Sequence, residues 1–351
     1  MKTKIIKIDS DNILPDQLEE AVEILKQGGL VAFPTETVYG LGADGLNKEA
    51  SRKIYEAKGR PSDNPLILHI AHLGALKELT IDCPEIGYQL AEAFWPGPLT
   101  MIFHKSEIVP YSATGGLDTV AIRMPSHPIA YELIRQTRAY IAAPSANISG
   151  RPSPTKAEHV IEDMDGRIDM IIDGGSVEIG LESTIIDITG PVPVLLRPGY
   201  ITVPMIEAVV GKIAVDKAVL STISDPSIVP KAPGMKYKHY APKGQLTIYE
   251  GNNEAVVQAI NKIAGEKQEE GYKVGIIATD ETFDAYSYGT VKRIGSRSDE
   301  DTIANRLFDI LRSFDKEGTE FIYTESFESN QLGQAIMNRL LKAAGYHKVT
   351  V

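Results

Sequence analysis

The sequence has a single cysteine, Cys83, among 351 residues. One cysteine excludes an internal disulfide and a cysteine-cluster metal site, and we interpret Cys83 as an inert packing residue. No apolar run reaches the roughly 18–20 residues that a membrane-spanning helix needs. The opening segment MKTKIIKIDSDN also lacks the apolar core of a signal peptide. These absences predict a cytoplasmic protein without a membrane partner and without redox chemistry.

Several common catalytic motifs are missing as well. The sequence contains no GxxxxGK[ST] phosphate loop, no HExxH, no CxxC and no GxSxG, which removes most support for the corresponding nucleotidases, zinc hydrolases and serine esterases. The segment GLGADG at 40–45 matches GxGxxG, but six residues separate it from the strand-like VAF at 31–33. A dinucleotide fold places the first glycine directly at the strand end, so we interpret 40–45 as a glycine-rich turn.

The composition is that of an ordinary globular protein, with 43% hydrophobic and 24% charged residues. The length favours two domains, since one domain typically has roughly 100–200 residues. The net charge is −11, and acidic residues outnumber basic ones both before and after residue 200. Bulk charge therefore gives neither part the character of a nucleic-acid-binding domain, although a local basic groove stays possible.

The pattern of apolar residues changes along the chain. Residues 1–205 alternate short strand-like and helix-like segments, which predicts an α/β domain with a mixed, twisted sheet and flanking helices. Residues 206–244 are polar, contain several prolines and have no clear helical period after about 212, so we predict a linker there. Residues 245–351 alternate strands with longer helices, which predicts a smaller three-layer domain with a parallel sheet.

Two polar segments follow predicted elements of the first domain. PTETVYGLG at 34–42 places Thr35 and Thr37 on a loop after a buried strand, where their hydroxyls either meet a polar ligand or stabilise a capped turn. Lys58 and Arg60 lie two residues apart at the end of a predicted helix. This pair suits a polyphosphate, but it would also complement the dipole of the helix C-terminus.

Other candidates sit at strand ends. Ser145 and Asn147 follow the apolar IAA segment at 141–143, and Ser153 precedes the next helix; these residues either bind phosphate oxygens or form ordinary turns. Arg123 lies within an apolar strand pattern and needs an anion, which a carboxylate of the protein or of a substrate could provide. The weaker candidates are His69, Ser183 and Arg197.

Together these segments form a pattern that the single motifs do not. The segments are, in chain order, PTETVYGLG, KGRP, NPLILHI, WPGPLT, GLDTVAIRMP, APSANISG with RPSPT, GGSVEIGLESTI and LLRPG. In this order and spacing they resemble the YrdC-like threonylcarbamoyl-AMP synthase family over roughly residues 10–200. APGMKYKHYAP and the remaining chain resemble the two-domain form of the family. The resemblance implies a YrdC-like domain over 1–205, a linker or lid over 206–244 and a Rossmann-like domain over 245–351.

The resemblance also implies the reaction and its residues. The family makes L-threonylcarbamoyladenylate and pyrophosphate from L-threonine, bicarbonate or CO2, and ATP. The implied catalytic tetrad is Lys58, Arg60, Ser145 and Asn147, all of which would also contact ATP. The implied threonine site is Thr35, His69, Arg123 and Ser183, with the substrate carboxylate as the anion of Arg123. The further ATP contacts implied are Thr119, Ser153, Arg197 and, in the linker, Tyr237.

Mg2+, held mainly by the ATP phosphates, is the expected cofactor, and its protein ligands stay unassigned. The linker segment 236–240 is either a lid over the adenylate or a solvated basic tether. The product would pass to a tRNA threonylcarbamoyl transferase system that modifies adenosine 37, with a weak direct tRNA contact as an option. A non-catalytic double-stranded RNA-binding module is the competing function. Carbamoyl transfer in hydrogenase maturation is disfavoured, because one cysteine cannot build the zinc fingers of those proteins.

Overall fold

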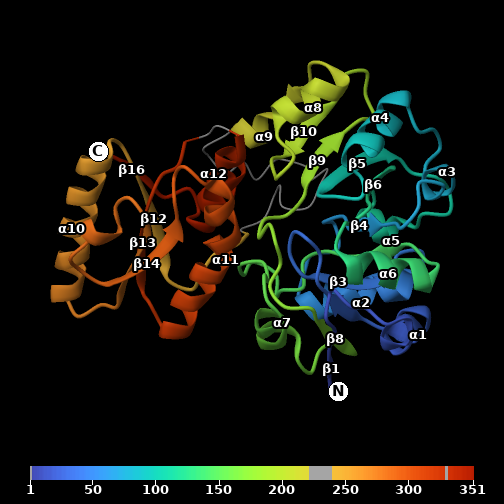
Figure 1. The fold of residues 1–351 in the computed structure, drawn as a ribbon, viewed down its shortest axis with the longest axis horizontal. Coiled ribbons are helices and arrows are strands. Elements are labelled where there is room, and N and C mark those ends of the chain that lie inside the picture. Colours follow the sequence, from blue (N-terminus) through green and yellow to red (C-terminus); the bar gives the residue numbers. More distant parts are fainter. Residues whose placement is uncertain (1, 221–238, 329–330) are drawn as a thin grey trace. The chain divides into compact units, whose positions relative to one another are not determined.

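A computed structural model of the chain describes residues 2–220, 239–328 and 331–351, which form two compact units (Figure 1). The described part of the first unit comprises residues 2–149 and 153–220, and that of the second comprises Gly150–Pro152, 239–328 and 331–351. Within these described ranges, no helix combines the length and the apolar character needed to cross a membrane. The predicted boundaries at 205 and 244 stay predictions, and Tyr237 lies outside the described residues.

The first unit is built on one large mixed sheet. In the described residues its strands are ordered β1-β8-β2-β3-β7-β4-β6-β5-β9-β10-β11, with both parallel and antiparallel neighbours. The sheet therefore confirms the mixed α/β architecture expected from the sequence. The strand bounds are β1 Lys4–Lys7, β2 Val31–Phe33, β3 Gly40–Asp44, β4 Ile67–His69, β5 Leu99–His104, β6 Thr119–Arg123, β7 Ile141–Ala142, β8 Met170–Asp173, β9 Thr184–Asp187, β10 Val194–Arg197 and β11 Ala214–Val215.

Both faces of this sheet are buried, as strand β2 illustrates. Val31 and Phe33 belong to one apolar cluster, whereas Ala32 between them belongs to another, because successive strand side chains point to opposite faces. Helix α1 packs against α6, and α2 packs against β3. The helices of this unit are α1 Glu19–Lys26, α2 Lys48–Lys58, α3 Ala75–Leu79, α4 Glu85–Phe94, α5 Tyr111–Thr114, α6 Pro128–Thr137, α7 Ala157–Met164, α8 Val203–Val210 and α9 Lys217–Leu220, and the 3-10 helix η1 is Pro15–Leu18.

The interpretation of GLGADG as a turn is wrong. Gly40–Asp44 is strand β3, which pairs antiparallel with β2 on one side and with β7 on the other. Glycine is needed there for packing: a Cβ on Gly42 would lie 2.6 Å from Cε1 of Phe33 and 3.0 Å from Cγ2 of Ile141. The glycines therefore let a bulky neighbour approach the strand, and they do not form a phosphate loop.

The structure also adds elements where the sequence pattern indicated none. After residue 212, β11 pairs parallel with β10 through Val194↔Ala214 and Leu195↔Val215, and α9 follows. A two-residue strand and a four-residue helix are too short to produce a readable period, which is why the pattern missed them.

The second unit has a five-stranded parallel sheet in the order β14-β13-β15-β12-β16. Figure 1 shows α10 on one side of this sheet and α11 and α12 on the other, which confirms the predicted three-layer arrangement of a parallel sheet with helices. Its elements are β12 Gln245–Glu250, α10 Asn253–Glu269, β13 Val274–Thr279, the 3-10 helix η2 Phe283–Ala285, β14 Thr290–Gly295, α11 Glu300–Glu317, β15 Phe321–Glu325, α12 Gln331–Ala343 and β16 Lys348–Thr350.

Candidate active site

Arg123 is the last residue of β6, and its side chain is buried in an ion pair. Its Nη2 lies 2.6 Å from Oε1 of Glu36, with 5% of the Arg123 side chain and 4% of the Glu36 side chain exposed. Nη1 donates a hydrogen bond to Oγ1 of Thr37 at 3.0 Å, and Nε donates to the Gly97 carbonyl at 3.4 Å. Burial, the largest single influence, acts to raise the pKa of Glu36, but the charge of Arg123 and the hydrogen bonds from Arg123 and from the backbone together hold that pKa below its ordinary value.

This pairing gives Arg123 an anion from the protein itself, and its pairing with a substrate carboxylate stays a prediction. In the structure the anion is Glu36, which lies within the PTETVYGLG segment and was not among the residues predicted for the site. A buried guanidinium cannot stay without a counter-charge, and the loop that carries Thr35 and Thr37 supplies it. The available signal was a lone carboxylate in an otherwise uncharged, strand-flanked segment.

Thr35 and His69 lie close to this ion pair along the same sheet edge. The Thr35 hydroxyl donates to the Val38 carbonyl at 2.6 Å and lies 2.8 Å from the Thr37 hydroxyl, so it stabilises the loop. His69 pairs with Arg123 in the parallel register of β4 and β6. Burial and the charge of Arg123 lower the pKa of His69 to about 3, so its imidazole is neutral at neutral pH. We call Glu36, Thr37, His69 and Arg123 the Arg123 cluster.

Ser183 and Arg197 contact each other directly. Arg197 donates from Nη2 to Oγ of Ser183 at 3.1 Å and from Nε to its carbonyl at 3.0 Å. The Ser183 hydroxyl is also 2.7 Å from that of Thr100, which pairs with Arg123 in the register of β5 and β6. The family resemblance implies that Ser183 and Arg197 contact different substrates; the structure places the two residues side by side and adds Thr100.

Lys58 ends helix α2 and joins it to the loop that follows β7. The helix is well delimited: Asn47 caps its start by accepting from two backbone N–H groups, and Gly59 ends it with φ 60°. Lys58 is 2% exposed, and its Nζ donates to the carbonyls of Ser145 and Asn147, the latter at 2.6 Å. Three of the four predicted catalytic residues are therefore in contact.

Arg60 is held on the segment that leads into β4, with Nη2 donating to the Pro65 carbonyl at 2.9 Å and to the Asn64 carbonyl at 3.3 Å. Thr119 begins β6, which runs parallel to β4, so the starts of both strands lie at one end of this pair. We call Lys58, Arg60, Ser145 and Asn147 the Lys58 cluster. Thr119 lies at the same end of the β4–β6 pair as this cluster. Arg123 lies at the other end of β6, about 13 Å further along the strand.

The loop from Pro34 to Tyr39 contacts both clusters. Its Thr37 hydroxyl accepts from Arg123, while its Tyr39 carbonyl accepts from the backbone N–H of Ala146 at 2.8 Å, between Ser145 and Asn147. Pro154 accepts from the N–H of Tyr39 at 2.9 Å. The neighbouring Ser153 donates to the carboxylate of Glu182, a second acidic residue that was not among those predicted for the site. One loop thus connects the predicted threonine and phosphate residues.

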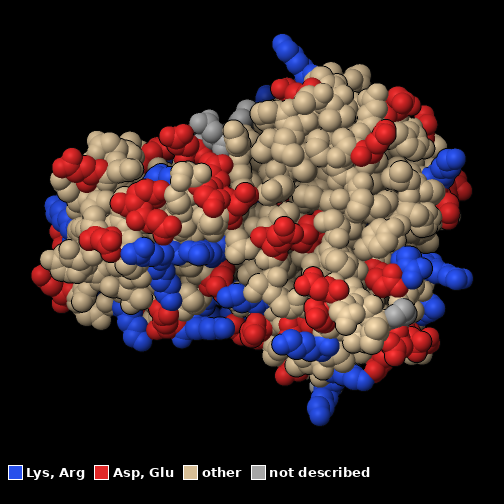
Figure 2. Space-filling model, in the orientation of Figure 1, with Lys and Arg blue, Asp and Glu red and all other residues tan. Residues whose placement is uncertain are grey.

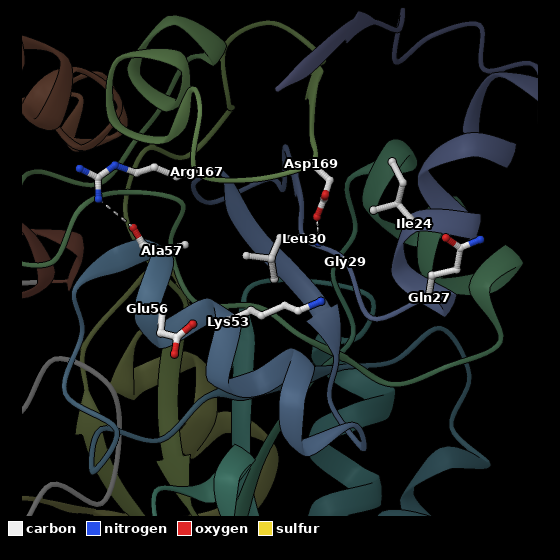
Figure 3. Close-up of a pocket in the computed structure, with 9 residues that line it drawn as sticks. All are labelled: Ile24, Gln27, Gly29, Leu30, Lys53, Glu56, Ala57, Arg167 and Asp169. Carbon is white, nitrogen blue, oxygen red and sulfur yellow. Dashed lines mark hydrogen bonds between the residues drawn. The ribbon is translucent and has the colours of Figure 1, made fainter. Parts of the chain in front are cut away.

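A separate cavity of about 410 Å³ lies at the surface of the same unit (Figure 3). It is bordered by residues of α1, of α2 and of the segment that leads into β8. Three of its charged side chains are hydrogen-bonded to the backbone. Lys53 donates to the Gly28 carbonyl at 2.6 Å, Asp169 accepts from the N–H of Leu30 at 2.8 Å, and Arg167 donates to the Ala57 carbonyl at 3.4 Å. No site residue predicted from the sequence lines it, so we place the active site at the two clusters.

Comparisons with known proteins identify the family of the chain. The family model described as "Telomere recombination" (Sua5_yciO_yrdC) matches residues 23–199, and the model described as "Threonylcarbamoyl-AMP synthase, C-terminal domain" matches residues 201–345. The threonylcarbamoyl-AMP synthase of Bacillus subtilis is 51% identical over 349 residues, covering 98% of this chain and 99% of that protein. The one from Pyrococcus abyssi is 50% identical, covering 94% of this chain and 95% of that protein.

A solved structure supports the same assignment over the whole chain. The crystal structure of P. abyssi Sua5 complexed with L-threonine superposes with a TM-score of 0.93 at 48% identity, covering 99% of this chain and 100% of that one. Two domain models and full-length relatives thus agree in every part of the sequence they cover. This chain belongs to the threonylcarbamoyl-AMP synthase family and is an enzyme of that kind.

Proposed function

We propose that this chain makes L-threonylcarbamoyladenylate from L-threonine, bicarbonate or CO2, and ATP, and releases pyrophosphate. One observation carries the proposal: the Arg123 cluster and the Lys58 cluster lie at opposite ends of the β4–β6 pair, and the loop from Pro34 to Tyr39 contacts both. The threonine bound to the P. abyssi relative supports the amino-acid half of the assignment.

In this proposal L-threonine binds at the Arg123 cluster. Arg123 is the cation for the substrate carboxylate, and its orientation is fixed by the Gly97 carbonyl behind it. The hydroxyls of Thr35 and Ser183 are available nearby for polar contacts, and the neutral His69 adds no competing charge. The site is buried, so each of these contacts acts in a medium of low polarity, where it is stronger than in water.

ATP binds at the Lys58 cluster. Lys58 and Arg60 bind the triphosphate, and Ser145 and Asn147 meet phosphate oxygens or the metal that accompanies them. We also propose contacts to ATP from Thr119 and Ser153. Arg197 is the last of the predicted ATP contacts within the described residues. It is hydrogen-bonded to Ser183, a predicted contact of the substrate L-threonine, which supports a position for Arg197 where the two substrates meet.

Mg2+ is proposed as a companion of the nucleotide. Within the part of the chain that the structure describes, no three His, Cys, Asp or Glu side chains are grouped to hold a metal ion. We propose that the ATP phosphates supply most of the oxygen ligands of the ion, and that the side-chain oxygens of Ser145 and Asn147 are the candidate ligands from the protein. When bound, Mg2+ would neutralise part of the charge on the leaving pyrophosphate.

The chemistry then consists of two steps. The threonine amine is carboxylated, and a carbamate oxygen attacks the α-phosphorus of ATP while pyrophosphate leaves. Both steps depend on placing reactants and neutralising charge, and the two clusters are built from groups suited to this. We propose that a separate transferase system moves the threonylcarbamoyl group to adenosine 37 of tRNA, and that Tyr237, outside the described residues, contacts ATP from a lid.

The alternative, a double-stranded RNA-binding module without catalysis, has less support. On the face drawn in Figure 2, basic and acidic side chains of the described residues are interspersed and form no broad basic band. With a net charge of −11, the protein has no bulk electrostatic attraction for a phosphate backbone.

The test is threonine-dependent release of pyrophosphate. The protein is incubated with ATP, Mg2+, bicarbonate and L-threonine, each omitted in turn, and the product is identified by mass spectrometry. We expect threonylcarbamoyl-AMP only in the complete mixture. A folded protein that releases no pyrophosphate in the complete mixture, yet shifts double-stranded RNA in a gel, would make the RNA-binding alternative the better function.

A further inference from the structure

The Glu36–Arg123 ion pair is difficult to explain by stability alone. Both side chains are almost completely buried, and removing two charges from water costs several kcal/mol per ion in a typical protein. Replacement of such pairs by apolar residues of similar volume is often neutral or stabilising. A fold that keeps this pair at the edge of its candidate active site therefore has a use for both charges.

Loop geometry holds Glu36 in place beside the cluster. The Glu36 carbonyl accepts from the N–H of Ile179 at 2.9 Å, and the Thr37 carbonyl accepts from the N–H of Gly180 at 3.0 Å. Backbone hydrogen bonds on consecutive residues fix the loop, so the carboxylate is pre-positioned.

The carboxylate of Glu36 has acceptor capacity that the protein does not use. Arg123 pairs with this carboxylate and the backbone N–H groups of Glu36 and Ser126 face it, yet neither Oε1 nor Oε2 accepts a hydrogen bond of regular geometry from the described residues. An ionised carboxylate has about four acceptor positions. Buried polar atoms are normally satisfied, so the unused positions indicate a donor that the protein itself does not provide.

The proposed substrate carries such a donor. At neutral pH L-threonine is a zwitterion, with an ammonium group and a carboxylate on the same carbon, so a buried site for it needs an anion as well as a cation. Arg123 is the cation. Of the titratable groups at this cluster, His69 is kept neutral by burial and the charge of Arg123, and burial lowers the pKa of His127; Glu36 is the carboxylate.

We propose that Glu36 binds the ammonium group of the amino-acid substrate and so places its nitrogen for carboxylation, while Arg123 takes the substrate carboxylate. This inference rests on the proposed function, because it takes the Arg123 cluster as the threonine site. Glu36 acts here as a binding and positioning group. It is not the base that removes the proton, since a carboxylate with a lowered pKa is a weak proton acceptor.

Carboxylation then changes the sign of the charge that faces Glu36. The ammonium gives one proton to solvent, and the amine displaces water from bicarbonate as the N–C bond forms, leaving an anionic carbamate. Attraction by Glu36 becomes repulsion, which favours a carbamate orientation away from Glu36. The same residue thus holds the substrate amine and disfavours a carbamate that stays beside it.

The first arm of the test uses the unaltered full-length protein. Calorimetric titration in the absence of ATP compares L-threonine, its deaminated analogue 2,3-dihydroxybutanoate and L-threoninamide, which lacks the carboxylate charge. We expect binding of L-threonine to be at least about tenfold tighter than that of the deaminated analogue, since a buried charge-assisted contact is lost. Equal binding of these two ligands would overturn the inference. Failure of L-threonine to bind at all would instead overturn the proposed function.

The second arm uses Glu36→Gln, which keeps the shape of the side chain and removes its charge, with Glu36→Asp as a charge-retaining control. In folded protein, checked by circular dichroism, we expect Glu36→Gln to weaken L-threonine binding about tenfold or more and to abolish the preference over the deaminated analogue. Glu36→Asp should retain part of that preference. Tighter threonine binding by Glu36→Gln would mean that Glu36 only competes with the substrate carboxylate for Arg123, and the inference would be wrong. If Glu36→Gln does not fold, the analogue series on the unaltered protein decides.

Discussion

Replacing Lys58 with methionine removes the ammonium group and keeps an unbranched side chain of similar length at a position that is 2% exposed. In the structure this ammonium donates to the carbonyls of both Ser145 and Asn147. A hydrogen bond from a charged donor contributes roughly 1.5–3 kcal/mol, and part of that sum is offset because the ammonium no longer has to be desolvated. We therefore expect Lys58→Met to lower the free energy of unfolding by about 2–4 kcal/mol.

That loss leaves a folded protein if the unit has an ordinary stability of about 5–15 kcal/mol, so activity can be measured. Because Lys58 is proposed to neutralise charge on the phosphates, we expect threonine-dependent pyrophosphate release to fall by about 10²–10³-fold. Urea unfolding gives the stability, and a coupled pyrophosphate assay gives the rate.

Lys53→Met is the matched control, since Lys53 lies on the same helix and also donates to a backbone carbonyl, that of Gly28, but is exposed. We expect this control to lose less than about 1 kcal/mol and to keep full activity. The reasoning fails if Lys58→Met unfolds at the same urea concentration as the unaltered protein, or if its pyrophosphate release stays within about threefold of normal.

Three further substitutions test other parts of the site and fold. Arg60→Ala should reduce pyrophosphate release by at least about 100-fold with only a small fall in melting temperature, and normal turnover would remove Arg60 from the phosphate site. His69→Asn tests pH dependence, because the pKa of His69 is about 3 in the folded state and about 6.5 in the unfolded state. The unaltered protein should therefore lose stability as the pH falls from about 6.5 towards 3, by up to about 1.4 kcal/mol per pH unit. The variant should lack this part of the pH dependence in urea unfolding. Gly42→Ala should destabilise by about 1–3 kcal/mol because its methyl group meets the Phe33 ring, and an unchanged melting curve would contradict that packing.

Local pattern was sufficient for most elements of the fold. Strand 31–33 occurs with the predicted bounds, because a short buried apolar run has a clear signature. Strand Gly40–Asp44 was missed because the three glycines of segment 40–45 suggest a turn until the neighbouring Phe33 ring is known. The tight packing that requires glycine there comes from a strand partner, and no local period reports it.

The residue types of the site were predictable, but their partners were not. Lys58, Ser145 and Asn147 come together in the fold through a contact between the lysine ammonium and two backbone carbonyls, which no sequence motif describes. Arg123 was expected to need an anion, and it has one, but the anion is Glu36, which is 87 positions earlier in the chain. A sequence indicates that a buried charge must be paired; only the folded chain identifies the pair.

The strand order explains why such pairings are hidden from the sequence. β4 and β6 are parallel neighbours, so His69 and Arg123 end side by side, whereas β5, which lies between them in the chain, pairs antiparallel on the far side of β6. β9 then joins β5 in parallel, which brings the preceding Ser183 to Thr100 at the same edge. Each step depends on a pairing between segments that are distant in sequence, and a single change of neighbour would move one of these side chains away. The site is therefore a property of the strand order, and substitutions that disturb this order should affect threonine binding even when they touch none of its residues.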